Sequence, residues 1–201
     1  MGNTRERILQ TALELFAQRG YEAVSVSDIA GALGMTKGAL YRHFESKRAI
    51  FESILRRMEQ QDSQEAQDHD LPQGTVEAEP TAYETAAVAD IVSFSKAMFR
   101  YWTEDPFAAP FRRMLTVEQY HSPEMAALYR QYLAAGPMGY VADLFRSLGL
   151  SDPERRAAAF YGPMFLLYSV YDGAEDKAAV TALLDEQLDH AEQIMKEETS
   201  C

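Results

Sequence analysis

The stretch SVSDIAGALGMTKGALYRHF, residues 25–44, decides the fold of this chain. It opens with a serine and places an aspartate three residues later, which is the spacing of a capping box. In that arrangement the serine oxygen accepts an unpaired backbone N–H and the carboxylate accepts the N–H of the capping residue. Apolar residues then recur at helical spacing, and Thr36 can cap a second helix. The stretch therefore predicts two short helices, 26–33 and 37–43, joined by a tight turn.

A longer helix is expected before this pair. Ile8, Ala12, Leu15 and Phe16 share one face at helical spacing, and Gly20 follows where a left-handed C-cap is wanted. A longer helix that braces two short ones is the arrangement of a helix-turn-helix, in which the second short helix lies in the major groove of DNA.

The second short helix carries side chains that suit such a groove. Positive charge, hydrogen-bond donors and small residues that let the backbone approach DNA all occur on it. Lys37 and Arg42 carry the positive charge. Thr36, Tyr41 and His43 supply the donors, and Gly38 and Ala39 are the small residues.

The run ALELFAQRGYEAVSVSDIAGALGMTKGALYRHFESKRAIFESIL, residues 12–55, resembles the DNA-binding head of the tetracycline-repressor (TetR) family. The resemblance covers about a quarter of the chain. It rests on several elements in fixed order: LF, GY, a capped helix containing IA, a turn ending in TKG, then LY and HF, and finally SK. It implies a transcriptional regulator, in most cases a dimeric repressor that a small-molecule ligand releases from a palindromic operator.

The resemblance also implies roles for individual residues. Ser25 and Thr36 contact phosphates or cap their helices. Tyr41 and His43 reach the DNA backbone, and Lys47 meets a phosphate at the start of the fourth helix with help from the helix N-terminus.

Base reading is expected from the same helix. The resemblance implies that Lys37 and Arg42 reach base edges or flanking phosphates. Two positions depart from the family pattern: Val24 stands where Thr is frequent, which removes one possible phosphate contact, and Ala39 stands where Thr or Ser is common. At Ala39 we expect either a lost hydrogen bond or a gained methyl contact with thymine.

The charge of the chain is unevenly distributed. The net charge is −12, yet residues 1–57 hold nine Lys or Arg and six Asp or Glu, a net charge of +3, and the remainder carries −15. A basic head on an acidic body suggests a nucleic-acid-binding module joined to another domain, although random unevenness in one domain explains the numbers equally well.

Beyond the head, the periodicity predicts only helices, near 82–103, 107–121, 123–148, 153–171 and 175–197. Residues 62–81 contain Pro72, Gly74 and Pro80 and are the best linker candidate, and we expect kinks or breaks at Gly136-Pro137 and Gly162-Pro163. The expected fold is all-α, with a three-helix helix-turn-helix head at 1–50 and a larger helical ligand-binding and dimerisation domain at 51–201. The helix 46–67 links the two.

Large aromatic and apolar side chains on these helices can enclose a pocket for an apolar or aromatic ligand, although ordinary helical core would look the same. The pocket candidates, with their polar anchors, are Phe94, Met98, Trp102, Glu118, His121, Tyr129 and Tyr132.

The last two predicted helices carry broad apolar stripes, which a two-fold dimer through a four-helix bundle would bury. The residues expected to dimerise are Tyr161, Phe165, Tyr168, Leu184, Leu188, Ala191 and Met195.

Other classes of function find little support. The only cysteine is Cys201, the four histidines have no metal-ligand spacing, and phosphate loops and nucleophile elbows are absent from the sequence. We therefore expect no catalytic residues, no metal and no cofactor. Without a membrane-length apolar run or an apolar leader, a cytoplasmic protein is expected. An all-α enzyme, or a helical adaptor that has lost DNA binding, stays open as an alternative.

Overall fold

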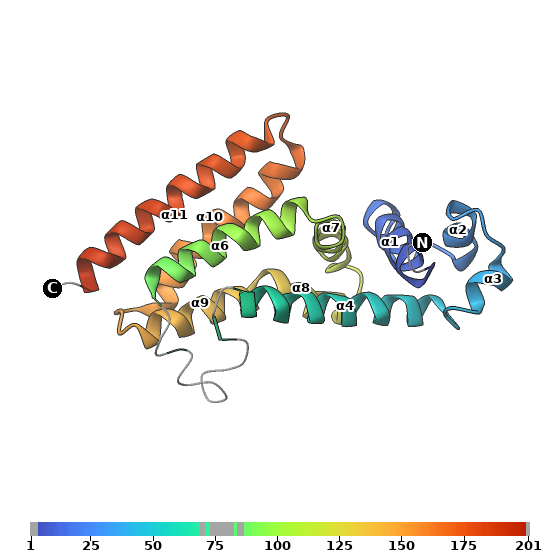
Figure 1. The fold of residues 1–201 in the computed structure, drawn as a ribbon, viewed down its shortest axis with the longest axis horizontal. Helices are drawn as coiled ribbons and strands as arrows, with labels where there is room; N and C mark the ends of the chain where they lie inside the picture. Colours follow the sequence, from blue (N-terminus) through green and yellow to red (C-terminus); the bar gives the residue numbers. More distant parts are fainter. Residues whose placement is uncertain (1–3, 69–70, 73–82, 84–86, 200–201) are drawn as a thin grey trace. The chain divides into compact units, whose positions relative to one another are not determined.

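The computed structural model describes residues 4–68, 71–72, 83 and 87–199 (Figure 1). Within that part of the chain all regular structure is helical, which confirms the expected all-α class. The helices of the N-terminal part are α1 (Thr4–Arg19), α2 (Val26–Ala32), α3 (Lys37–Tyr41) and α4 (Lys47–Asp68). The later helices are α6 (Val88–Glu104), α7 (Ala108–Glu118), α8 (Pro123–Leu133), α9 (Ala135–Ser147), α10 (Pro153–Gly173) and α11 (Lys177–Thr199).

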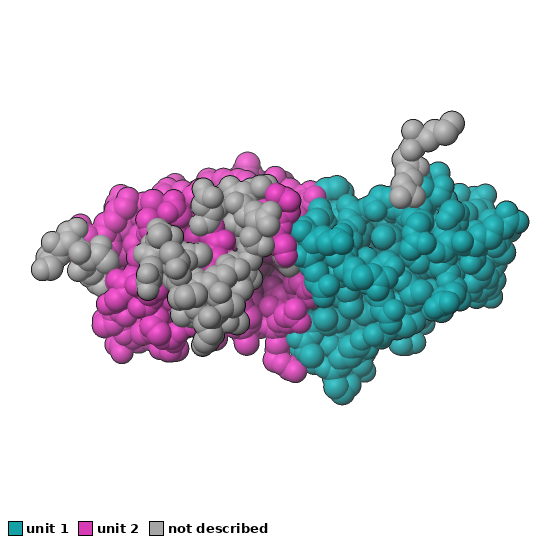
Figure 2. Space-filling view, turned by 60° about the horizontal axis from the view of Figure 1, so that its bottom comes forward, with its two compact units in different colours: residues 1–61, 106–129 teal, residues 62–105, 130–201 magenta. Residues whose placement is uncertain are grey.

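The chain packs as two compact units, coloured teal and magenta in Figure 2. Unit 1 joins Met1–Gln61 to Pro106–Tyr129, and unit 2 joins Asp62–Asp105 to Arg130–Cys201. Packing thus adds α7 and most of α8 to the helix-turn-helix, a grouping that the sequence did not predict. The functional boundary at residue 50 stays a prediction.

The core of unit 1 forms around an aromatic cluster. The ring of Tyr21 lies 5.0 Å from that of Phe16 on α1 and 5.1 Å from that of Phe51 on α4. Ile8, which the helical spacing placed on an inner face, is fully buried, whereas Leu15, expected on the same face, is half-buried. Burial of each such side chain stabilises the fold by about 1.5–3 kcal/mol.

The core of unit 2 joins α6, α9, α10 and α11. The ring of Phe99 on α6 stacks on that of Tyr168 on α10 at 5.3 Å. Ion pairs tie α6 to α11, with the Lys96 ammonium 2.6 Å from the Asp189 carboxylate. Because α10 packs against α6, α9 and α11, its apolar residues are needed on more than one side.

Several predicted boundaries change. The sequence favoured one helix over 123–148, but the chain breaks at Ala134, where φ is −128° and ψ is −99°. Pro137 lacks the N–H that would bond to the carbonyl four residues earlier, and it fits within the first turn of a new helix, where that N–H has no helical partner. The break expected at Gly136-Pro137 therefore occurs, slightly earlier in the chain.

Two other expectations concern breaks in the chain. Helix α4, Lys47–Asp68, agrees with the expected helix 46–67, so the first part of the linker candidate 62–81 is helical. Of the rest, 69–70 and 73–81 lie outside the described residues. At 162–163, where a kink or a break was expected, the helix does not break, because α10 runs from Pro153 to Gly173 with Pro163 inside it. Packing on three neighbouring helices outweighs the one hydrogen bond that a proline removes.

Candidate nucleic-acid interface and ligand pocket

The capping box at the start of α2 is present as the sequence predicts. The Ser25 side chain accepts the Asp28 N–H at 3.1 Å, and the Asp28 carboxylate accepts the Ser25 N–H at 2.8 Å. Hydrogen bonds from Ser25 hold the pKa of Asp28 below its usual value. The Ser25 hydroxyl therefore has a structural partner, and a contact with phosphate stays a prediction.

The turn before α3 is also as expected. Gly34 has a φ of +65°, a left-handed conformation that glycine adopts without strain. The Thr36 side chain accepts the Ala39 N–H at 3.1 Å and so caps α3. Leu40 is fully buried and anchors the helix to the core of unit 1.

The outer face of α3 is available for contact. Lys37, Gly38 and Arg42 are exposed, and the Tyr41 side chain is 43% exposed although it is large and aromatic. A Cβ added at Gly38 would meet nothing within 4 Å, so this backbone lies open to solvent. Ala39 and His43 are half-buried. Val24 is 1% exposed, so its departure from the family pattern affects the core and not the surface.

A hollow beside the end of α3 brings in residues that the sequence analysis missed. It is lined by Tyr41, Arg42 and His43 together with Arg5 from α1 and Ser53 and Arg56 from α4, among others. The Arg5 guanidinium donates to the His43 carbonyl at 2.8 Å. Ser53 and Arg56 are three residues apart on α4, a spacing that puts both side chains on one face of the helix. This spacing could have indicated from the sequence that they act together.

Lys47 is held inside unit 1. Its ammonium donates to the Tyr21 carbonyl at 2.7 Å and lies 4.2 Å from the centre of the Tyr21 ring. The same ammonium lies 3.8 Å from the Glu22 carboxylate. Lys47 thus closes the turn after α1 onto α4, and its predicted contact with phosphate requires these bonds to be given up or shared.

Glu118 lies in unit 1 and has a structural partner there, unlike the ligand anchor that the sequence analysis expected. Its side chain is 4% exposed, and its carboxylate accepts the Tyr21 N–H at 3.0 Å. A Cβ at Gly20, whose φ is +84°, would lie 2.9 Å from the same carboxylate. Glu118 therefore fixes α7 to the turn after α1, inside unit 1.

The neighbouring candidates share that location. The His121 ring lies 3.4 Å from the Glu118 carboxylate and is exposed, and Tyr129 also belongs to unit 1. A second link in this unit is the Arg48 guanidinium, which donates two hydrogen bonds to the Glu124 carboxylate at 2.8 and 2.7 Å. These bonds lower the pKa of Glu124.

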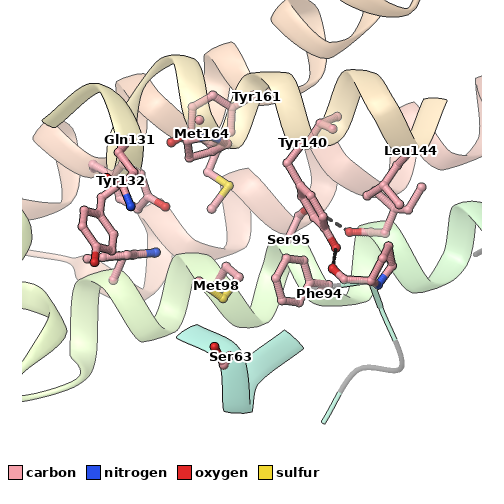
Figure 3. A pocket seen from close by; sticks show the side chains of 17 residues that line it. Ser63, Phe94, Ser95, Met98, Gln131, Tyr132, Tyr140, Leu144, Tyr161 and Met164 are labelled. Carbon is pink, nitrogen blue, oxygen red and sulfur yellow. Dashed lines mark hydrogen bonds between the residues drawn. The ribbon is translucent and has the colours of Figure 1, made fainter. Parts of the chain in front are cut away.

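A cavity of about 340 Å³ lies in unit 2 (Figure 3). Phe94, Met98 and Trp102 line it from α6, and Tyr132 lines it from the end of α8, so four of the seven pocket candidates are brought together. Its other lining residues are Ser63, Pro72, Ile91, Ser95, Gln131, Gly136, Pro137, Tyr140, Val141, Leu144, Tyr161, Met164 and Tyr168.

The cavity is aromatic and uncharged. Among the lining residues that the structure describes, no Asp, Glu, Lys, Arg or His occurs. Its backbone shape depends on Gly136, because a Cβ there would lie 1.9 Å from the Gln131 carbonyl oxygen. A volume and lining of this kind suit a small apolar ligand.

The fold has close counterparts among solved structures. A transcriptional regulator of the TerR/AcrR family from Aquifex aeolicus has a TM-score of 0.67 at 19% identity, with 93% of this chain and 98% of that chain covered. A regulatory protein of the tetR family from Rhodococcus RHA1 has a TM-score of 0.63 at 18% identity, with 96% and 97% covered. At these identities the likeness concerns the fold.

Sequence comparisons match the head. A family model, that of the bacterial regulatory proteins of the tetR family, matches residues 8–54. The head of the chain therefore carries a DNA-binding domain of the TetR family type. The repressor KstR2 of Rhodococcus jostii is 48% identical over 52 residues, 26% of each chain, and the regulator AcrR of Shigella flexneri is 47% identical over 51 residues, 25% of this chain and 24% of that protein. The match thus spans about a quarter of the length of these relatives.

The residues predicted to form a dimer interface lie on α10 and α11, and most of them are not on the surface of these helices. Phe165 is 39% exposed and Ala191 is half-buried. The other five residues expected to dimerise are buried within the single chain and leave little surface for a partner, so their predicted role at an interface stays a prediction. They are Tyr161, Tyr168, Leu184, Leu188 and Met195.

A different apolar face is exposed on the same two helices. On α10 it includes Leu166 at 63% and Val170 at 44%, next to Phe165. On α11 it includes Leu183 at 47% and Ile194 at 43%, which stand about three helical turns apart on one face. Helical spacing alone could not tell which of two apolar faces packs internally.

Other site types find no support in the part of the chain that the structure describes. No three metal-binding side chains gather there, and none of its helices has the length and hydropathy to cross a bilayer.

Proposed function

We propose that this TetR-family chain binds a palindromic DNA operator as a homodimer and represses transcription until a small molecule in the unit 2 cavity releases it. The observation that carries the proposal is the outer face of α3, where Lys37, Tyr41 and Arg42 surround an open glycine backbone. Phosphate contacts would set the register of this helix and contacts with base edges would read the sequence.

The dimer is proposed to form through the exposed apolar face of Phe165, Leu166, Val170, Leu183 and Ile194. A monomer rarely leaves such a face in water, and a two-fold axis through α10 and α11 would bury two copies of it. Two recognition helices about 34–36 Å apart would then enter successive major grooves.

Release is proposed to work by differential affinity. A ligand shifts the equilibrium only if it binds the form with wrongly spaced heads better than the form that fits the operator. Helix α4 contributes residues to both units and is the proposed route of coupling. The uncharged aromatic lining supports an apolar or aromatic ligand.

The test of DNA binding compares variants on DNA taken from beside the protein's own gene and on an unrelated fragment. Tyr41→Ala should weaken binding to both fragments, and Arg42→Ala should also reduce the preference, by about 1–3 kcal/mol for a lost base contact. Arg155→Ala, which removes an exposed charge from unit 2, serves as the matched control. Folded variants of α3 that bind DNA like the parent would refute the assignment of this helix.

The test of the dimer is sedimentation equilibrium. Leu166→Arg places a charge on the proposed face and should shift the protein towards monomer. Val117→Arg makes the same change at an exposed residue of α7 and should leave the mass unchanged. A monomeric parent, or a Leu166→Arg variant that stays dimeric, would overturn the proposed interface.

A further inference from the structure

The hollow beside the end of α3 gathers positive charge from three parts of unit 1. It has a volume of about 350 Å³ and lies at the corner where the chain passes from α3 into α4 (Figure 1). We refer to it as the basic hollow, and its lining residues are Arg5, Tyr41, Arg42, His43, Phe44, Glu45, Ala49, Ser53 and Arg56. Its three arginines outnumber its one glutamate, so the basic hollow attracts an anion.

The Arg56 guanidinium is held at this place by a neutral partner. It donates to the Ser53 hydroxyl oxygen at 2.7 Å, and that hydroxyl donates its own hydrogen to the Ala49 carbonyl at 2.9 Å. Because the serine hydrogen is used on the backbone, the serine oxygen is left to accept from Arg56. The Arg56 side chain is exposed, and within the described part of the chain no carboxylate pairs with it.

Two arginines elsewhere in unit 1 do have carboxylate partners. The Arg19 guanidinium lies 3.5 Å from the Asp28 carboxylate, and the Arg48 guanidinium lies 2.7 Å from the Glu124 carboxylate. Arg56 differs from both because its fixed partner carries no charge. A guanidinium that is oriented but not neutralised suits a ligand that brings the negative charge, and its fork of donors matches a phosphate group.

The Arg5 guanidinium shapes the basic hollow from α1. It donates to the His43 carbonyl at 2.8 Å and lies 4.3 Å from the centre of the Phe44 ring. Phe44 is itself buried, so these contacts fix the turn after α3 against the core of unit 1. The lining is therefore held in place before any ligand arrives, which reduces the cost of binding.

The position of the basic hollow suits a phosphate of the DNA backbone. The five residues of α3 span about 7.5 Å, and the major groove is about 12 Å wide, so the ends of α3 would lie close to the phosphates at the edges of the groove. Lys47, which the sequence predicted for a phosphate, already donates to the Tyr21 carbonyl. The basic hollow offers a second cation near the same end of α3.

We propose that the basic hollow receives a phosphate group of the DNA backbone, outside the bases that α3 reads, and that Arg56 donates to this phosphate. The inference rests on the proposed function, because it requires α3 to enter the major groove. It extends the DNA-contacting surface to the third turn of α4. A contact with phosphate carries no sequence information, so it should add affinity for every duplex.

The test is the salt dependence of binding to DNA from beside the protein's own gene and to an unrelated duplex of equal length. Each phosphate contact adds about 0.9 to the slope of log affinity against log salt concentration. Arg56→Gln should weaken binding to both duplexes and lower this slope by about 1 for each bound head, or about 2 for the proposed dimer. From about 50 to 200 mM salt, the affinity of the variant should therefore fall roughly 10-fold less than that of the parent.

Two matched variants separate a contact from general attraction. Arg56→Lys keeps the charge and should keep the slope of the parent. Arg113→Gln makes the same change of charge at an exposed arginine of α7, in unit 1 but outside the basic hollow, and should leave the slope unchanged. Circular dichroism checks that each variant is folded.

An unchanged slope for Arg56→Gln would overturn the inference. An equal fall for Arg113→Gln would also overturn it, because the effect would then come from the charge of the whole head. Inorganic phosphate is titrated against the chain without DNA by calorimetry. Phosphate binding that Arg56→Gln abolishes, together with an unchanged slope on DNA, would assign the basic hollow to a free anion instead.

Failure of the proposed function gives a different result. Equal binding of the parent to both duplexes would count against sequence reading, while the slopes would still decide the phosphate contact. A parent that binds neither duplex would overturn both proposals.

Discussion

Removal of the Glu118 carboxylate should destabilise unit 1. In the folded chain this carboxylate is almost fully buried and accepts the backbone N–H of Tyr21 at 3.0 Å. The substitution Glu118→Ala leaves that N–H unpaired beneath α7. A buried donor without a partner costs about 1–3 kcal/mol.

The expected shift follows from the size of the chain. A loss of about 2 kcal/mol corresponds to a fall in Tm of roughly 4–8 °C for a protein of this length. Glu118→Gln keeps an oxygen that can accept the same N–H and should lose less than half as much. Glu104→Ala, an exposed carboxylate on α6, should change stability by no more than about 0.5 kcal/mol.

The assay is thermal unfolding followed by circular dichroism under identical buffer conditions. If Glu118→Ala melts together with the parent, the carboxylate does not hold the turn after α1, and the grouping of 106–129 with the helix-turn-helix loses its main polar support. If Glu118→Gln falls as far as Glu118→Ala, the hydrogen bond to Tyr21 is not the cause of the loss.

Three further outcomes are expected. Gly136→Ala should lower Tm because its Cβ would lie 1.9 Å from the Gln131 carbonyl oxygen. As a control, the Cβ of Gly139→Ala meets nothing within 4 Å, so this variant should be neutral or more stable by up to about 1 kcal/mol. Equal melting temperatures for the two variants would contradict this. Gly38→Ala should leave Tm unchanged or raised, yet weaken DNA binding, and unchanged affinity would show that the backbone does not approach DNA. The pKa of Asp28 is lowered in the folded chain, so the stability that its charge contributes is present above the unfolded pKa of about 3.9 and is lost as pH falls through the folded pKa. The Tm difference between the parent and Asp28→Asn should therefore be constant above about pH 5 and shrink below about pH 4. A difference independent of pH would refute the role of the charge.

The head of the chain was predictable because its signals are local. A capping serine, a glycine with positive φ and apolar residues at helical spacing each depend on neighbours within one or two turns. The structure confirms the capping box at Ser25 and the cap at Thr36.

The body was less predictable because its helices carry apolar residues on more than one face. Tyr161 and Leu184 were expected at a dimer surface, yet both are buried inside the chain, and Leu166 is exposed instead. Periodicity shows that a face is apolar and does not show which neighbour covers it.

Polar partners distant in sequence were also missed. The contact between Glu118 and Tyr21 joins residues 97 positions apart. The sequence marked Glu118 as a polar residue among apolar ones, which fits a ligand anchor and a structural hydrogen bond equally well. Only the three-dimensional contact decides between them.

The central claim, that the chain reads a DNA sequence as a two-fold dimer, is tested most directly by selecting bound duplexes from a random library. The account predicts enrichment of an inverted repeat whose half-sites are about 10–10.5 base pairs apart, or a multiple of that spacing. Enriched duplexes should bind about 10³-fold more tightly than unselected ones at equal salt concentration. Selection that enriches no common sequence would contradict it.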